Sequence, residues 1–241
     1  MAQACEQLRS RAIVGRMNPQ YRKSIVGLLI LFLVMATLIF VPAGTLYYWQ
    51  AWLYMAAYFG ASIAISLYLI KKDPALLARR MSGGPFAEKE PAQRVIMSIT
   101  SLGFIALAIV PALDHRFGWS HVPAYAVLLG DLVMLLGWLG IYFVFRENSF
   151  AAATIQSSPD QRVISTGPYA WVRHPMYAAA LLMLLGISPA LGSWWGIPIV
   201  IAILPALIWR LTDEERFLVR NLAGYSEYQA RVRYRLLPFV W

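Results

Sequence analysis

Arg173, His174 and Tyr177 stand at the start of an apolar segment and combine residue types that can bind a charged small molecule. Pro175 disfavours helical geometry at His174 and suits the first position of a helix. The unpaired N–H groups at such a helix start attract a carboxylate or a phosphate. Tyr177 follows His174 by one helical turn, so both side chains share a face. The pattern predicts either an anion-binding helix start or, without a ligand, a basic anchor beside a capping histidine.

A second polar stretch, Asp213-Glu214-Glu215, follows another apolar segment. Arg210 precedes Glu214 by one helical turn, so we expect that the two can form an ion pair. Three adjacent acids cannot all pair on one helix face. The stretch is therefore either a solvated extension of the helix or a place where one glutamate turns inward to bind a cation or a sugar diol. The residues leave open which glutamate that is.

The elements that must position these residues are six apolar runs. A helix that spans a bilayer needs about 20 mostly apolar residues. The runs cover residues 24–40, 49–70, 95–113, 122–145, 175–191 and 194–209. Only Gly192-Ser193 separates the last two, which predicts a tight helical hairpin that brings the His174 and Glu214 stretches together.

Composition agrees with a membrane protein. Hydrophobic residues make up 59% of the 241 residues and charged residues only 14%, whereas a soluble domain carries about 25% charged residues. We predict an all-α, polytopic integral membrane protein of about six transmembrane helices. Residues 1–145 would form an N-terminal four-helix region, and residues 146–241 would hold the hairpin and a polar tail.

Basic residues predict the orientation of the chain. With six helices and both termini in the cytoplasm, 20 of the 21 lysines and arginines lie on the cytoplasmic side, and only Arg116 lies outside. Basic residues favour that side of a membrane. The net charge of +9 therefore comes from residues that flank apolar segments, which argues against a nucleic-acid partner and for contact with membrane lipids.

Several kinds of site are excluded by what the sequence lacks. There is no glycine-rich nucleotide loop, no H-E-x-x-H and no cluster of Cys and His, so we expect no metal site. Cys5 is the only cysteine, which excludes an intramolecular disulfide. Asp131 lies inside the fourth apolar run, where we expect a hydrogen bond to a neighbouring helix, with an ion path as the alternative.

Four motifs in the last two-fifths of the chain carry a family resemblance. In order they are Gly167-Pro168-Tyr169, Arg173-His174-Pro175-Met176-Tyr177, Glu214-Glu215, and Gly224-Tyr225-Ser226-Glu227-Tyr228 followed by Arg235-Leu236-Leu237-Pro238. With an apolar hairpin between them, they resemble the isoprenylcysteine carboxyl methyltransferase family, in its broad bacterial branch. One departure is that Ala178 and Ala179 follow the tyrosine where many members have glycine.

The resemblance implies S-adenosyl-L-methionine as cofactor and methyl transfer in a membrane-embedded site. It assigns the catalytic roles to Arg173 and His174. It assigns cofactor binding to Gly167, Pro168, Tyr169, Arg173, His174, Pro175, Tyr177, Glu214 and Glu215.

The same resemblance implies a hydrophobic or lipid-like acceptor that presents a carboxylate, thiol or amine. The location would be the bacterial inner membrane, with the site toward the cytoplasm. Two alternatives are an NADPH-dependent membrane reductase of the sterol-reductase kind and a non-catalytic transporter or scaffold. No signal in the sequence favours a particular oligomeric state.

Overall fold

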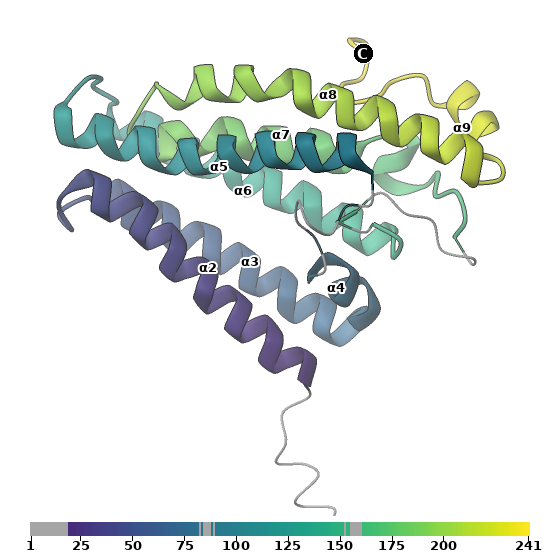
Figure 1. Cartoon of the computed structure of the whole chain (residues 1–241), viewed down its shortest axis with the longest axis horizontal. Coiled ribbons are helices and arrows are strands. Elements are labelled where there is room, and N and C mark those ends of the chain that lie inside the picture. Colours follow the sequence, from purple (N-terminus) through teal and green to yellow (C-terminus); the bar gives the residue numbers. More distant parts are fainter. Residues whose placement is uncertain (1–18, 82, 84–87, 89, 152, 155–160) are drawn as a thin grey trace, which may run out of the picture.

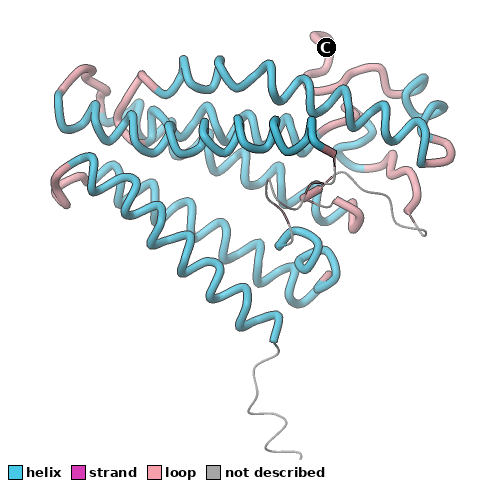
Figure 2. The backbone as a smooth tube through the Cα atoms, viewed as in Figure 1, coloured by secondary structure: helices cyan, strands magenta, loops and turns pink. Residues whose placement is uncertain are grey.

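The computed structural model describes residues 19–81, 83, 88, 90–151, 153, 154 and 161–241. Cys5 and four of the basic residues used for the topology, Arg9, Arg11, Arg16 and Lys89, lie outside the described residues. The predicted all-α, polytopic class is confirmed, because every regular element of the described part of the chain is helical (Figure 2). The elements are α2 (Pro19–Ala43), α3 (Trp49–Lys72), α4 (Pro74–Met81), α5 (Pro91–Phe117), α6 (Ala124–Glu147), η2 (Gly167–Ala170), α7 (Pro175–Ala190), α8 (Gly196–Asn221) and α9 (Tyr225–Arg231).

Five helices of the described residues are long and apolar enough to cross a membrane, namely α2, α3, α5, α6 and α8. The fifth predicted segment is α7, a shorter apolar helix of 16 residues. In Figure 1, α5 to α8 run along a common direction, and α2 and α3 form a pair inclined to them. The cytoplasmic position of both termini stays a prediction.

The boundary that differs most from the prediction is the end of α8. The apolar run ends at residue 209, but the helix continues to Asn221. Asp213, Glu214 and Glu215 are therefore helical, and successive side chains point about 100° apart around the axis. The predicted helix extension is confirmed in this respect, although the acids in it are not all solvated.

The closest helix pair is α6 with α7, and glycine makes this approach possible. A Cβ on Gly137 would lie 2.6 Å from the backbone N of Met183 and 2.8 Å from the carbonyl O of Ala179. A Cβ on Gly186 would lie 2.5 Å from the carbonyl O of Gly130. Ala179 of α7 fits this interface because Gly137 and Gly140 face it from α6.

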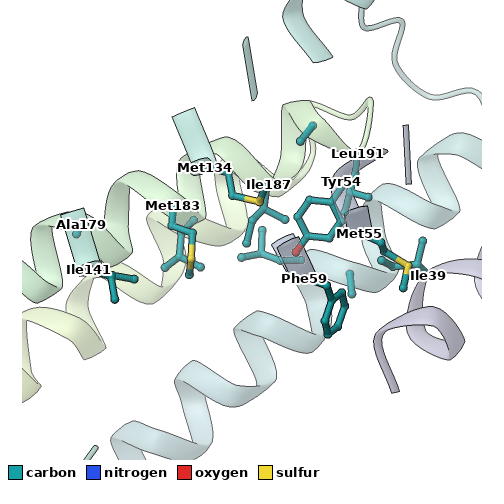
Figure 3. Packing of buried hydrophobic residues seen from close by; sticks show 14 of the residues in the cluster. Ile39, Tyr54, Met55, Phe59, Met134, Ile141, Ala179, Met183, Ile187 and Leu191 are labelled. Atoms are coloured by element: carbon teal, nitrogen blue, oxygen red, sulfur yellow. The ribbon is translucent and has the colours of Figure 1, made fainter. Parts of the chain in front are cut away.

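Apolar side chains fill the space between this pair and α3. Figure 3 shows Met134 and Ile141 of α6 beside Met183 and Ile187 of α7, with Tyr54 of α3 packed against the same cluster. All five side chains are buried. The core therefore fixes α3 against the α6–α7 pair, which also carries the polar stretch that precedes α7.

The turn between α7 and α8 is held by hydrogen bonds at the end of the bundle away from that polar stretch. Gly192 adopts a left-handed conformation with φ +69°. Ser193 donates its hydroxyl to Asp114 at 2.5 Å, and Tyr48 donates its hydroxyl to the carbonyl of Leu191 at 2.5 Å. The predicted hairpin is confirmed, and this turn holds α7 and α8 side by side.

Gly137→Ala tests the close approach of α6 and α7. We expect a loss of about 1–3 kcal/mol in the free energy of unfolding, because the added methyl group meets backbone atoms that cannot move aside. The midpoint of thermal unfolding in detergent measures it. Gly60→Ala is the matched control, because a Cβ at Gly60 meets no atom within 4 Å. Equal midpoints for Gly137→Ala and wild type would contradict the interface.

Candidate active site

The start of α7 has the predicted geometry. His174 has φ −124° and ψ 60°, which is not helical, and Pro175 occupies the first helical turn. The preceding backbone pairs with the C-terminal segment, since the Arg173 N–H donates to the carbonyl of Tyr234 and the His174 N–H to that of Arg235, both at 2.9 Å. The tail therefore fixes the strand-like stretch that carries Arg173 and His174.

Glu215 lies at the centre of a buried ionic cluster and is only 5% exposed. Its Oε1 accepts from Arg173 Nε at 2.8 Å and lies 3.1 Å from His174 Nε2. Its Oε2 accepts from Arg235 Nε at 3.0 Å. A carboxylate held by two guanidinium groups is ionised and can only accept, so Nε2 of His174 carries a proton. In neutral His174, Nδ1 is then the ring nitrogen that can accept one.

Glu214 points in a different direction from Glu215. Its Oε2 accepts from the hydroxyl of Tyr177 at 2.7 Å, and that hydroxyl accepts from Arg210 Nε at 3.1 Å. The predicted ion pair between Arg210 and Glu214 is wrong. The Arg210 guanidinium pairs instead with Glu88 at 2.8 Å, and the Tyr177 hydroxyl bridges it to Glu214.

The turn Gly167–Ala170 contributes Tyr169 to the site, while Gly167 and Pro168 shape the turn without lining the cavity. Gly167 has φ +56°, and a Cβ there would lie 3.0 Å from the carboxylate of Glu147. The Tyr169 hydroxyl accepts from Asn148 Nδ2 at 2.8 Å. Burial raises the pKa of Tyr169 to about 12, although the hydrogen bond from Asn148 acts in the opposite direction. Tyr169 is therefore neutral at physiological pH.

A cavity of about 690 Å³ joins these residues to the apolar interior. Its polar end is lined by Tyr169, Arg173, His174, Pro175, Tyr177, Arg210 and Glu214. Gly167, Pro168 and Glu215 are predicted cofactor contacts that do not line it. Of the two glutamates, Glu214 lines the cavity. Glu215 does not line it, but it contacts Arg173 and His174, which do.

The cavity's other end lies among helices of the N-terminal half. Its apolar lining includes Leu31 of α2, Ile65 and Leu69 of α3, and Met97 and Phe104 of α5. Leu31 and Phe104 are also 37% and 45% exposed, so residues that line this end of the cavity form part of the outer surface of the bundle. The same cavity is thus polar near the start of α7 and apolar near the residues that would face lipid.

Three polar residues of the site were missed because they belong to the N-terminal half, where no motif occurs. Arg80 of α4 lines the cavity, with Nη1 3.5 Å from Met176 Sδ and its guanidinium 5.2 Å from the ring centre of Phe145. Burial lowers the pKa of Arg80. Glu88 and Gln93 hold Arg210, each at 2.8 Å. A buried charge needs a partner, but the sequence does not show which one.

Asp131 does not have the predicted hydrogen bond. It is 5% exposed, and neither carboxylate oxygen has a hydrogen-bond partner in the part of the chain that the structure describes. The prediction of a bond to a neighbouring helix is therefore wrong. Among the described residues, no group of three or more His, Cys, Asp or Glu could hold a metal ion.

The fold and the site define a class: an integral membrane protein of apolar helices with a polar, charged pocket that opens into the apolar interior. The sequence profile of the phospholipid methyltransferase family matches residues 125–224. The matched region covers nearly all of α6, the whole of α7 and α8, and most of the polar pocket, so this part of the chain is similar to a family of membrane methyltransferases. The resemblance carried by the motifs is confirmed.

Three curated proteins are similar over part of the chain. The cobalt-zinc-cadmium resistance protein CzcN of Cupriavidus metallidurans is 29% identical over 48% of this chain and 61% of its own length. The Delta(14)-sterol reductase TM7SF2 of Mus musculus is 29% identical over 58% of this chain and 38% of its own. The nickel-cobalt-cadmium resistance protein NccN of Alcaligenes xylosoxydans xylosoxydans is 22% identical over 53% and 58%. The chain thus spans less than two thirds of each relative's length.

Glu215→Gln tests the ionic cluster. Removing the charge leaves Arg173 and Arg235 without their carboxylate, and breaking a buried ion pair costs about 3–5 kcal/mol. We expect a lower midpoint of thermal unfolding in detergent. Glu214→Gln is the matched control, because Glu214 accepts from a neutral tyrosine hydroxyl and should lose far less stability. Equal losses for the two variants would show that Glu215 does not organise the cluster.

Proposed function

We propose that the protein transfers a methyl group from S-adenosyl-L-methionine to a hydrophobic or membrane-borne acceptor. The observation that carries the proposal is one cavity with a charged end and an apolar end, where lining residues such as Leu31 and Phe104 are also exposed on the outer surface. Its charged end is built largely by the region that matches the methyltransferase family. A water-soluble cofactor and a lipid-soluble acceptor can meet only in a space of this kind.

The polar lining fits the chemistry of the cofactor. A cavity of about 690 Å³ lies within the usual range for small-molecule sites, about 300–1,000 Å³. Glu214 could accept from the ribose hydroxyls or the amino group, and Arg173 could face the carboxylate. The rings of Tyr169 and Tyr177 could face the adenine or the cationic sulfonium. When bound, the cofactor supplies an electrophilic methyl group.

The residues of the chain would then act mainly by positioning. Methyl transfer is an in-line displacement, which gains from fixed orientation and from the exclusion of water. A carboxylate acceptor needs no base. A thiol or amine acceptor must lose a proton, and Nδ1 of His174 is free to take it because Nε2 faces Glu215. Glu215 would fix the tautomer and the orientation of the ring.

The two reactants would arrive from different phases. Leu31 and Phe104 line the cavity and are exposed, so an acceptor dissolved in the bilayer could enter between α2 and α5. The distribution of basic residues supports an orientation with the polar end toward the cytoplasm. Together with the resemblance to the bacterial branch of the family, this supports our proposal of a bacterial inner-membrane location, with the cofactor entering from the cytoplasm.

A second candidate is an NADPH-dependent reductase. The specific observation in its favour is the partial match to a Delta(14)-sterol reductase. Arg80 and Arg210 line the same cavity and could face phosphate groups. The match covers 38% of that reductase, and the family profile of methyltransferases covers the residues of the polar pocket, which favours the first proposal.

Calorimetric titration of the detergent-purified protein with S-adenosylhomocysteine, with NADPH as the control ligand, tests the choice of cofactor. We expect micromolar binding of S-adenosylhomocysteine alone. Glu214→Gln should weaken it roughly tenfold or more, because hydrogen bonds to a charged group contribute about 1.5–3 kcal/mol. Binding of NADPH alone would replace the proposal by the reductase. Binding of neither by folded protein would favour the transporter or scaffold.

Ser66→Trp tests the apolar route. Ser66 lines the cavity on α3, and a tryptophan there should obstruct the acceptor while leaving the polar end intact. We expect unchanged binding of S-adenosylhomocysteine and at least a roughly tenfold loss of methyl transfer, because the acceptor would no longer reach its reactive position. Radiolabelled S-adenosyl-L-methionine, incubated with native membranes and extracted into organic solvent, measures the transfer. Leu67→Trp is the control, because Leu67 is exposed and does not line the cavity. Equal transfer by both variants would exclude this route.

A further inference from the structure

A second groove is lined in part by Glu215, which the main cavity does not reach, and the proposed methyl transfer does not use this groove. Its volume is about 410 Å³. Its lining comes from the polar end of α8, from α9 and from the C-terminal tail: Thr212, Glu215, Arg216, Val219, Arg220, Gln229 and Arg235. Except for Glu215 and Val219, each of these side chains offers a hydrogen-bond donor.

The charge of this groove is strongly positive. Arg216 and Arg220 are exposed and lie one turn apart on α8, so they present two guanidinium groups to the same side. No carboxylate of the described residues lies within ion-pair distance of either. The lining's one carboxylate, Glu215, is already bound by Arg173, His174 and Arg235. The groove therefore has an excess of cations that its own acid does not neutralise.

Exposed apolar side chains occur on the same C-terminal tail that supplies Arg235 to the groove. The C-terminal residues Leu237, Phe239 and Val240 are 52%, 85% and 76% exposed. The tail is attached to the groove, because Arg235 contacts Glu215 and its guanidinium lies 5.0 Å from the ring centre of Trp241. Figure 1 shows the C-terminus beside α8. Apolar and aromatic residues beside arginines are typical of a surface in contact with lipid headgroups and the upper acyl chains.

We infer that this groove binds the phosphate of an anionic phospholipid headgroup from the protein's own membrane. Guanidinium groups bind phosphate oxygens through paired, charge-assisted hydrogen bonds. A free phosphate ion would satisfy the arginines but not the apolar tail, whereas a phospholipid satisfies both. The position of the groove also fits, because it lies just past the end of the apolar part of α8 at residue 209.

Lipid binding at this groove would restrain the candidate active site through the C-terminal tail. Arg235 joins the groove to Glu215, and the backbone of Tyr234 and Arg235 accepts hydrogen bonds from Arg173 and His174. A headgroup that holds the tail against α8 would therefore hold the stretch that carries Arg173 and His174 in place. The groove needs no cofactor for its own binding, so its test is independent of the proposed methyl transfer.

Native mass spectrometry tests the inference. The purified protein is equilibrated with mixed micelles of phosphatidylglycerol and phosphatidylcholine, and the lipid retained by each variant is counted. We expect wild type to retain phosphatidylglycerol in preference. Arg216→Gln/Arg220→Gln should reduce that retention roughly tenfold, because each arginine near an anionic surface contributes to binding. Arg231→Gln/Arg233→Gln removes the same charge outside the groove and should retain the lipid.

Three outcomes would overturn the inference. They are equal retention of both lipids by wild type, unchanged retention of phosphatidylglycerol by Arg216→Gln/Arg220→Gln, and binding of inorganic phosphate alone with the same affinity, which would indicate a site for a soluble anion. Misfolding is excluded separately, since Arg216→Gln/Arg220→Gln should keep the lipid-free thermal midpoint of wild type.

Discussion

A single buried carboxylate sets the arrangement of the polar half of this molecule. Glu215 lies where a lone charge would be very costly, so it must be neutralised by partners in contact with it. The partners come from other segments: Arg173 and His174 from the stretch before α7, and Arg235 from the tail. Because removal of Glu215 would leave the buried Arg173 without its carboxylate, and because Arg235 shares the same carboxylate, the helix, the loop and the tail stabilise one another's positions.

The hairpin makes this cluster possible through matched lengths. Starting from the turn, α7 runs for 16 residues, so the same depth on α8 falls about 16 residues after Gly196, near Thr212. The polar extension of α8 therefore begins where α7 begins. The glycines of α6 and the hydrogen bonds of Asp114 and Ser193 at the far end keep the helices close enough for this matching to hold. The site depends on contacts made at both ends of the bundle.

The dependence of the site on the hairpin and on the ionic cluster explains which parts of it could be predicted. Hydropathy and the short Gly192-Ser193 connection suffice to predict the helices, the hairpin and the convergence of His174 with the glutamates. The choice between Glu214 and Glu215 could not be made, because it depends on where the tail packs around α8. The pairing of Arg210 with Glu88 could not be predicted either, since a contact across 122 residues leaves no local pattern. Local periodicity identifies elements, whereas the partners of buried charges are decided by tertiary packing.

The two adjacent glutamates divide two roles, since one holds the buried cationic cluster and the other faces the cavity. A carboxylate that holds Arg173, His174 and Arg235 has most of its accepting capacity occupied, and Glu215 does not line the cavity. A carboxylate that accepts from one tyrosine hydroxyl retains accepting capacity toward the cavity. Adjacent positions on a helix point about 100° apart, so the pair can face the protein interior and the cavity at the same depth. One side of the helix thus supports Arg173 and His174, and another presents Glu214 to the cavity, whose apolar end is lined by residues of α2, α3 and α5.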